Sequence, residues 1–248
     1  MSPNLARLGF VLLIFVVWEG FARLGNISPI LVAPPTEVIW HILRIFSTFT
    51  TVPEFYTNAW ITLRELGAAF GITVFLGVAM GFAFSANKTV GDAFEPILLV
   101  FYAIPKIILY PIVFLMLGTE MMPKIVYGIM VGIFVVVLNT AAGLRQVEPV
   151  YIALARSMGY NKLEVFFKVI IPAAAPTMLA GLRMGFGRCI IGVIVGELLV
   201  VNAGLGYLID WASFQYFTPE LYALILITLS LGYFGNLGFN ILENRWIK

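Results

Sequence analysis

The sequence predicts an all-α membrane protein with six transmembrane helices. Hydrophobic residues make up 61% of the 248 residues and charged residues only 11%, whereas a soluble domain has about 45–50% and about 25%. Six segments are apolar over the roughly 20 residues that a helix needs to cross a bilayer. Glycine and proline recur within them, as transmembrane helices tolerate. The six predicted spans are residues 7–24, 58–85, 94–117, 123–143, 173–201 and 220–242.

The first span is predicted to be an anchor helix that is retained. Its apolar run begins at Leu8 and continues through Glu19 to Arg23 without a cleavage site of the Ala-x-Ala kind. This span, with the segment that follows it, forms the first predicted part of the chain, residues 1–57. Residues 58–248 form the second part, a five-helix core that carries a polar loop at 148–172.

The segment after the anchor is predicted to lie outside the cell. Pro34 and Pro35 open a short helix whose polar and apolar residues fall on different faces, as expected of an amphipathic helix on a membrane surface. His41 lies on the polar face, and we expect it to be solvated.

Basic residues set the predicted orientation. With the amino terminus inside, three basic residues lie outside: Arg23, Arg44 and Lys124. Eight lie on the cytoplasmic side: Arg7, Lys88, Arg145, Arg156, Lys162, Lys168, Arg245 and Lys248. This asymmetry follows the positive-inside rule and places both termini in the cytoplasm.

Several classes of function are excluded. A single cysteine, Cys189, and a single histidine, His41, leave no disulfide framework and no cysteine or histidine cluster for a metal. The net charge of +2 is too small for a nucleic-acid-binding protein. An intramembrane protease would need a serine motif with a partner histidine, and His41 lies outside the spans. We therefore expect no enzyme active site on this chain.

The polar loop between the fourth and fifth spans is predicted to form two short helices. Pro149 suits the first turn of a helix, and Gly159 suits the left-handed residue that ends it. Asn161 and Glu164 have the spacing of a capping box for the second helix. Pro172 then precedes the fifth span.

The first loop helix is too short to span a membrane, yet it is mostly apolar. One face can lie on the chain's own bundle, but the other needs a different cover, since an exposed apolar patch usually marks an interaction site. We interpret it as a docking site for a separate protein. The alternative is a plain helix at the membrane interface.

The loop resembles the EAA motif of permeases of ATP-binding-cassette importers. Ala153-Leu154-Ala155, Gly159 and Val169-Ile170-Ile171-Pro172 match its spacing. Ala153 replaces the usual glutamate and Leu154 the first alanine, so docking should depend more on apolar fit than on charge. Further fragments, such as Thr62-Leu63-Arg64 and Gly196-Glu197-Leu198-Leu199, resemble the branch that imports sulfonates, taurine, nitrate and similar ions.

The resemblance implies a bacterial inner-membrane complex. Two copies of this permease would join two ATPase subunits and an external, periplasmic substrate-binding protein. ATP and Mg would reside on the ATPases, because this chain lacks the Gly-x4-Gly-Lys-Ser/Thr sequence that holds phosphates, and the chain itself would carry no cofactor. The residues implied to contact the ATPase are Ile152, Ala153, Leu154, Ala155, Arg156, Ser157, Met158, Gly159 and Tyr160.

Ionisable residues inside spans are costly and suggest functional positions. Lys106 lies in the middle of the third span beside Pro105, where it could attract an anion, snorkel, or form an ion pair between subunits. Arg183 and Arg188 could line an inward cavity or pair with carboxylates. Glu197 is a candidate gate or bracing residue, with Asn139 as a polar neighbour. The resemblance to the sulfonate, taurine and nitrate branch implies a small anion as the solute, and Lys106, Arg183 and Arg188 agree with it. The alternative function is a channel or secondary transporter without a motor.

Overall fold

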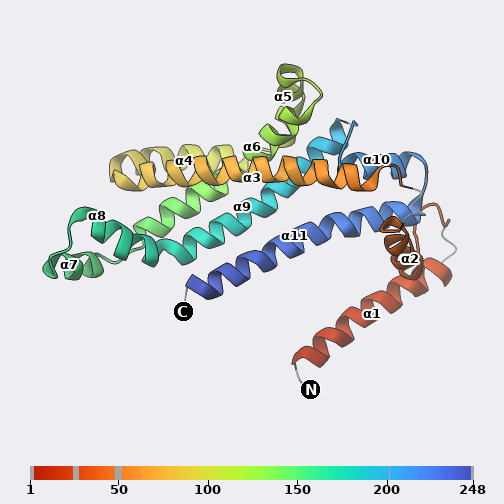
Figure 1. The fold of residues 1–248 in the computed structure, drawn as a ribbon, viewed down its shortest axis with the longest axis horizontal. Coiled ribbons are helices and arrows are strands. Elements are labelled where there is room, and N and C mark those ends of the chain that lie inside the picture. Colours follow the sequence, from red (N-terminus) through yellow and green to blue (C-terminus); the bar gives the residue numbers. More distant parts are fainter. Residues whose placement is uncertain (1–2, 25–27, 48–51, 201, 247–248) are drawn as a thin grey trace. The chain divides into compact units, whose positions relative to one another are not determined.

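The computed structural model describes residues 3–24, 28–47, 52–200 and 202–246, and every regular element within these ranges is a helix. The chain divides into two compact units. The first comprises Met1–Ile61 and Ala203–Leu231, and the second comprises Thr62–Asn202 and Gly232–Lys248. The helices, shown in Figure 1, are α1 (Pro3–Leu24), α2 (Pro35–Ile45), α3 (Phe55–Ala86), α4 (Lys88–Ala103), α5 (Tyr110–Leu117), α6 (Met121–Arg145), α7 (Pro149–Ser157), α8 (Lys162–Val165), α9 (Ile171–Leu199), α10 (Leu205–Phe214) and α11 (Thr218–Trp246).

The all-α membrane fold is confirmed, whereas the number of spans is not fixed. Four described helical stretches are long and apolar enough to cross a membrane. They are Phe55–Ala86, Met121–Arg145, Lys162–Leu199 and Thr218–Ile241. A bent pair of helices raises the number to as many as five. The predicted anchor forms α1, which is not among these helices, so a total of six spans stays a prediction.

The third predicted span is not one continuous helix. Its two halves, Thr89–Ala103 and Lys106–Leu117, meet at an angle of 80°. Pro105 lies at the bend, and Ile104 before it is extended, with φ −61° and ψ 131°. A proline disfavours helical geometry in the preceding residue and offers no N–H to the helix. The hydropathy of residues 94–117 conceals this break, and the predicted third span is a bent pair of helices.

The second unit is built around the antiparallel pair α6 and α9. Gly128 of α6 faces Gly192 of α9 towards one end of the pair, and Gly143 faces Ala174 towards the other. We refer to these as the Lys124 end and the Arg145 end, after residues of α6 that lie there. Helices α7 and α8 lie at the Arg145 end, where α6 finishes and α9 begins (Figure 1).

The loop forms two helices that meet at Gly159, as predicted. The second of them does not stop before the span, however. It runs from α8 through a π-helical turn at Phe166–Ile170 into α9. The wider π turn precedes Pro172, whose missing N–H leaves a gap in the regular helical hydrogen bonding. The second loop helix, α8, and the span helix, α9, thus form one continuous helical rod, whereas α7 lies before the Gly159 turn.

In the first unit, the prediction for His41 was wrong. Its Nδ1 lies 3.2 Å from Oε1 of Glu220, and only 18% of its side chain is exposed. The helix forms as expected in α2, but His41 faces protein together with the buried Val38 and Ile45, while Trp40 is exposed. The sequence could not show this, because Glu220 is distant along the chain.

Candidate functional site

A cavity beside the break between α4 and α5 brings together two of the predicted basic residues. Its volume is about 370 Å³. Lys106, on the 3₁₀ turn Lys106–Leu109 after the break, and Arg188, on α9, both line it. The remaining lining residues are Tyr102, Ala103, Ile104, Pro105, Ile107, Tyr127, Val131, Ile191 and Val195.

Both cations converge on Tyr102. The Lys106 Nζ donates to the Tyr102 carbonyl oxygen at 3.0 Å and lies 5.1 Å from the centre of the Phe134 ring. An Nη2–H of Arg188 donates to the Tyr102 hydroxyl at 3.2 Å, and its guanidinium lies 5.7 Å from the Tyr102 ring centre. These neutral and aromatic groups hold the two side chains in place without cancelling their charges.

No acidic residue lines this cavity, and neither cation forms an ion pair with a described carboxylate. Lys106 is half-buried and Arg188 is exposed, and two positive charges that line one cavity repel each other unless an anion compensates them. A guanidinium binds oxyanions through a planar pair of N–H groups, and an ammonium adds a compact point charge. The cavity is therefore suited to a small oxyanion.

The other three predicted path residues, Arg183, Asn139 and Glu197, lie elsewhere. Arg183 pairs with Glu243 of α11 and does not line the Lys106–Arg188 cavity. Asn139 donates to the carbonyl oxygen of Val135 on its own helix at 2.8 Å and lies against Gly181. It is not the neighbour of Glu197, because the antiparallel register places Glu197 at the opposite end of α6. That expectation was wrong.

Glu197 belongs instead to a buried ionic cluster at the Lys124 end. Its Oε1 accepts a hydrogen bond of 2.6 Å from the Thr62 hydroxyl, and its carboxyl contacts that of Glu65. The Lys124 Nζ lies 3.4 Å from Glu65 Oε1 and donates to Asn202 Oδ1 at 2.8 Å. Lys124, Glu65 and Glu197 are each at most 1% exposed.

The sequence reasoning missed Lys124, which counted only as an outer basic residue. The cluster ties the ends of α3, α6 and α9 together, because Lys124 pairs with Glu65 and the Glu65 carboxyl contacts that of Glu197. A signal was present in the sequence. Lys124 lies at the start of the fourth predicted span, and Glu65 and Glu197 lie near the outer ends of the second and fifth spans. Which of them meet could not be derived without the packing of the helices.

The turn at Gly159 has the hydrogen bonds that end a helix in the Schellman pattern. The Tyr160 N–H donates to the Ala155 carbonyl at 3.2 Å, and the Gly159 N–H donates to that of Arg156 at 3.0 Å. Gly159 has φ +85°, which glycine adopts without steric cost. This turn fixes the direction in which α7 leaves the bundle.

The capping box at the start of α8 is confirmed. The Glu164 N–H donates to Asn161 Oδ1 at 2.9 Å, and the Asn161 N–H donates to Glu164 Oε2 at 3.0 Å. Lys168 pairs with Glu164 at 3.0 Å and lies 4.9 Å from the Tyr160 ring centre. Both sides of the Gly159 turn are therefore locally rigid.

Helix α7 presents an exposed apolar stripe. Val150, Leu154 and Met158 are 60%, 59% and 66% exposed and recur at the spacing of one helix face. Ala155, in contrast, is buried, and Ile152 is half-buried. A partner could therefore contact the stripe and the exposed Ala153, Arg156, Ser157 and Gly159, while Ala155 supports the loop from beneath.

Comparisons with known proteins identify the family and the fold. A family described as "Binding-protein-dependent transport system inner membrane component" matches residues 73–248. The fold resembles that of the methionine ABC transporter MetNI in an inward-facing conformation, with a TM-score of 0.62 and 17% identity. The match covers 75% of this chain and 96% of the other.

Two curated relatives match nearly the whole chain. The formylaminopyrimidine transport permease protein ThiX of Halalkalibacterium halodurans is 29% identical over 235 residues, covering 95% of this chain and 92% of the relative. The taurine transport system permease protein TauC of Escherichia coli is 27% identical over 245 residues, covering 96% and 87%.

Proposed function

Because this chain belongs to the family of binding-protein-dependent transport inner membrane components and is a permease subunit of an ATP-binding-cassette importer, we propose that the solute it passes is a small oxyanion. The observation that carries this proposal is the Lys106–Arg188 cavity. It holds two cations and no carboxylate next to the only broken span among the described helices.

The chemistry of the cavity favours an organic sulfonate or a similar anion. A sulfonate offers three oxygens for the guanidinium and ammonium donors, and the Tyr102 and Tyr127 rings can cover its organic part. The relative named for taurine transport is consistent with this choice. A cationic solute would be repelled by the same two side chains.

We further propose how this chain meets its partners. Two ATPase subunits, which carry ATP and Mg, would each hold one 148–172 loop of a pair of permeases, and an external binding protein would deliver the solute. Support comes from the exposed stripe on α7 and from the absence of a phosphate-binding sequence. This arrangement requires both termini to lie in the cytoplasm of a bacterial cell.

ATP would drive transport by favouring one conformation of the helices over another. Closure of the ATPase pair would move the two loops together. Since α8, the π turn and α9 form one helical rod, this movement would shift Arg188 relative to Lys106. Such a change requires contacts that differ in free energy between the two states, and the cation pair provides one such contact for a bound anion.

Removing either cation should slow import of a solute that is held by its sulfonate group. Lys106→Gln and Arg188→Gln are each expected to lower taurine import at saturating binding protein about tenfold, since losing one charged contact costs about 1.4 kcal/mol or more. The double variant should lose more. The measurement is the initial rate of radiolabelled taurine uptake into proteoliposomes that contain the complete complex.

The matched control changes Arg183, which lies on α9 as Arg188 does. Arg183→Gln combined with Glu243→Gln removes a paired arginine of α9 without leaving a lone carboxylate, and it should change uptake less than twofold. Taurine import at the wild-type rate by the Lys106→Gln/Arg188→Gln double variant would rule out the cavity as the anion's passage.

A further inference from the structure

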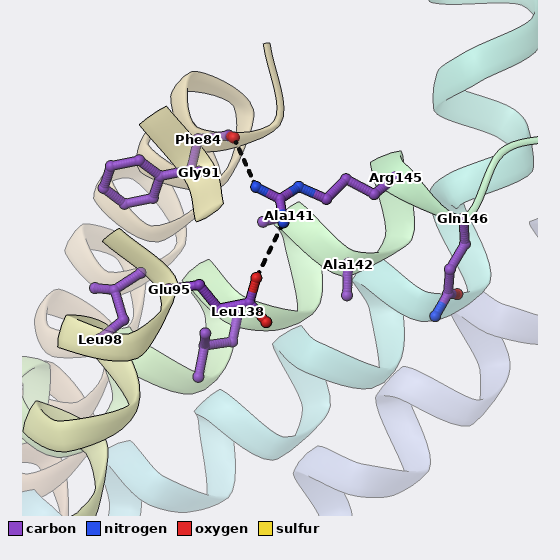
Figure 2. A pocket seen from close by; sticks show the side chains of 9 residues that line it. All are labelled: Phe84, Gly91, Glu95, Leu98, Leu138, Ala141, Ala142, Arg145 and Gln146. Carbon is purple, nitrogen blue, oxygen red and sulfur yellow. Dashed lines mark hydrogen bonds and ion pairs between the residues drawn. The ribbon is translucent and has the colours of Figure 1, made fainter. Parts of the chain in front are cut away.

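A second arginine joins three helices at the Arg145 end of the bundle. Arg145 is the last residue of α6 and lies shortly before the 148–172 loop, which we call the coupling loop. Its Nη1 lies 3.0 Å from Oε2 of Glu95 and 3.3 Å from Oδ1 of Asp92, both on α4. Its Nη2 donates to the Phe84 carbonyl oxygen at the end of α3, at 3.2 Å (Figure 2). We call this group the Arg145 clamp.

The clamp is tightly fitted around the first turns of α4. A side chain at Gly91 would place its Cβ 1.6 Å from Arg145 Nη2 and 2.3 Å from the Phe84 carbonyl oxygen. The guanidinium therefore occupies the space directly over this glycine. A cavity of about 270 Å³ opens beside it, walled by apolar residues that include Leu98 and Leu138 (Figure 2).

Besides the clamp, α4 is attached to the second unit mainly by apolar and aromatic side chains, including the stack of Phe94 on Phe84, and by Tyr102 near its end. Most of its side chains are exposed, for example Ile97 at 48% and Val100 at 62%. Leu98 is buried, and Phe101 stacks on Phe134 at 6.1 Å. The Arg145 clamp is thus the polar connection between α4 and the start of the coupling loop.

The same helix ends at the anion cavity. Tyr102, on which Lys106 and Arg188 converge, lies two turns after Glu95, roughly 10 Å along the helix axis. Between these residues α4 contains Pro96, whose missing N–H removes one backbone hydrogen bond, but the helix continues to Ala103. The remaining hydrogen bonds hold successive turns together, so a displacement can pass along the helix. Movement at the clamp therefore reaches the wall that contains Tyr102.

We propose that the Arg145 clamp is a positioning device that carries movement of the coupling loop to α4, and through α4 to Tyr102 and Lys106. This inference rests on the proposed function. Arg145 touches neither solute nor nucleotide in this scheme. It determines whether the α4 wall of the cavity follows the loop when the ATPases close.

Breaking the clamp should leave the fold intact and uncouple the complex. Asp92 and Glu95 are more than half exposed, and exposed ion pairs contribute little to stability. In proteoliposomes with the complete complex, Arg145→Gln should lower the taurine imported per ATP hydrolysed roughly two- to thirtyfold, the range seen for residues in coupling networks. Basal ATP hydrolysis should be unchanged.

A second readout needs no transported solute. A cysteine placed at Ile104, at the end of α4 in the cavity wall, should react with a membrane-impermeant maleimide at different rates with and without ATP and vanadate. The native Cys189 is buried and gives little background. In the Arg145→Gln background this nucleotide dependence should disappear. Because this labelling uses no transported solute, it tests the Arg145 clamp even if the proposed solute is wrong.

Two further variants distinguish transmission from simple loss of structure. Asp92→Asn with Glu95→Gln should uncouple in the same way, and the charge exchange Arg145→Glu with Glu95→Arg should restore at least half of the wild-type ratio. Arg7→Gln, which alters an exposed arginine of α1, is the matched control and should have no effect. The proposal is overturned if Arg145→Gln or the Asp92/Glu95 variant keeps the wild-type ratio and nucleotide dependence, or if the charge exchange restores neither.

Discussion

Replacing Gly159 by aspartate is expected to abolish ATP-driven import while leaving the membrane bundle folded. No atom lies within 4 Å of a Cβ added at this position, so the fold has room for the side chain. The φ of +85° is unfavourable for other residues by about 1 kcal/mol. The larger effect comes from a carboxylate on an apolar docking surface, where an unpaired buried charge costs about 2–5 kcal/mol.

The expected result is loss of ATPase subunits on co-purification, or a complex in which solute no longer stimulates ATP hydrolysis. Gly159→Asn is the control, because asparagine has nearly the same shape, tolerates the left-handed conformation and carries no charge. It should retain most of the uptake. Wild-type assembly together with wild-type uptake in Gly159→Asp would refute the docking of a partner at this turn.

The Lys124 cluster should produce the largest change in stability. Lys124→Met removes the ammonium that pairs with Glu65 and leaves two buried carboxylates in contact. Losing one partner of a buried pair costs about 3–5 kcal/mol. For a chain of this size, such a loss corresponds to a fall of about 10 °C in the midpoint of thermal unfolding, which can be followed in detergent.

The reason for this loss can be tested with a second substitution. Lys124→Met combined with Glu65→Leu removes both charges and should regain much of the stability, since apolar replacement of a complete buried pair is often neutral or better. Lys168→Met removes an ion pair whose side chains are 55% and 36% exposed, and it should cost less than about 1 kcal/mol. A Lys124→Met chain as stable as the wild type would show that the cluster does not hold the helices together.

Features that depend on neighbours in sequence could be predicted. The Gly159 turn and the Asn161–Glu164 capping box are formed by residues a few positions apart, and their geometry follows from backbone chemistry alone. The long apolar helices follow from composition in the same way. The role of Pro105 was also visible locally, but the uninterrupted hydropathy around it concealed the break.

Features that depend on helix packing could not be predicted. Thr62 and Glu197 are 135 residues apart in sequence, and His41 meets Glu220 only because the first unit folds. Lys106 and Arg188 were suspected separately for their charge, whereas their convergence on Tyr102 required the bend at Pro105 and the placement of α9. The same holds for Arg145, which the sequence presents only as one more cytoplasmic cation.

The central claim, that this permease passes a small solute with a sulfonate or similar oxyanion group when ATPase partners act on its loop, is tested most directly by reconstituted uptake. Proteoliposomes would contain the chain with its two ATPase subunits, binding protein would be supplied outside with radiolabelled taurine, and ATP would be enclosed within. If the claim holds, taurine uptake will be observed, and it will stop when ATP is replaced by a non-hydrolysable analogue or when the ATPase subunits are omitted. Taurine flux of comparable rate through the purified chain alone, in liposomes without ATP, would contradict it.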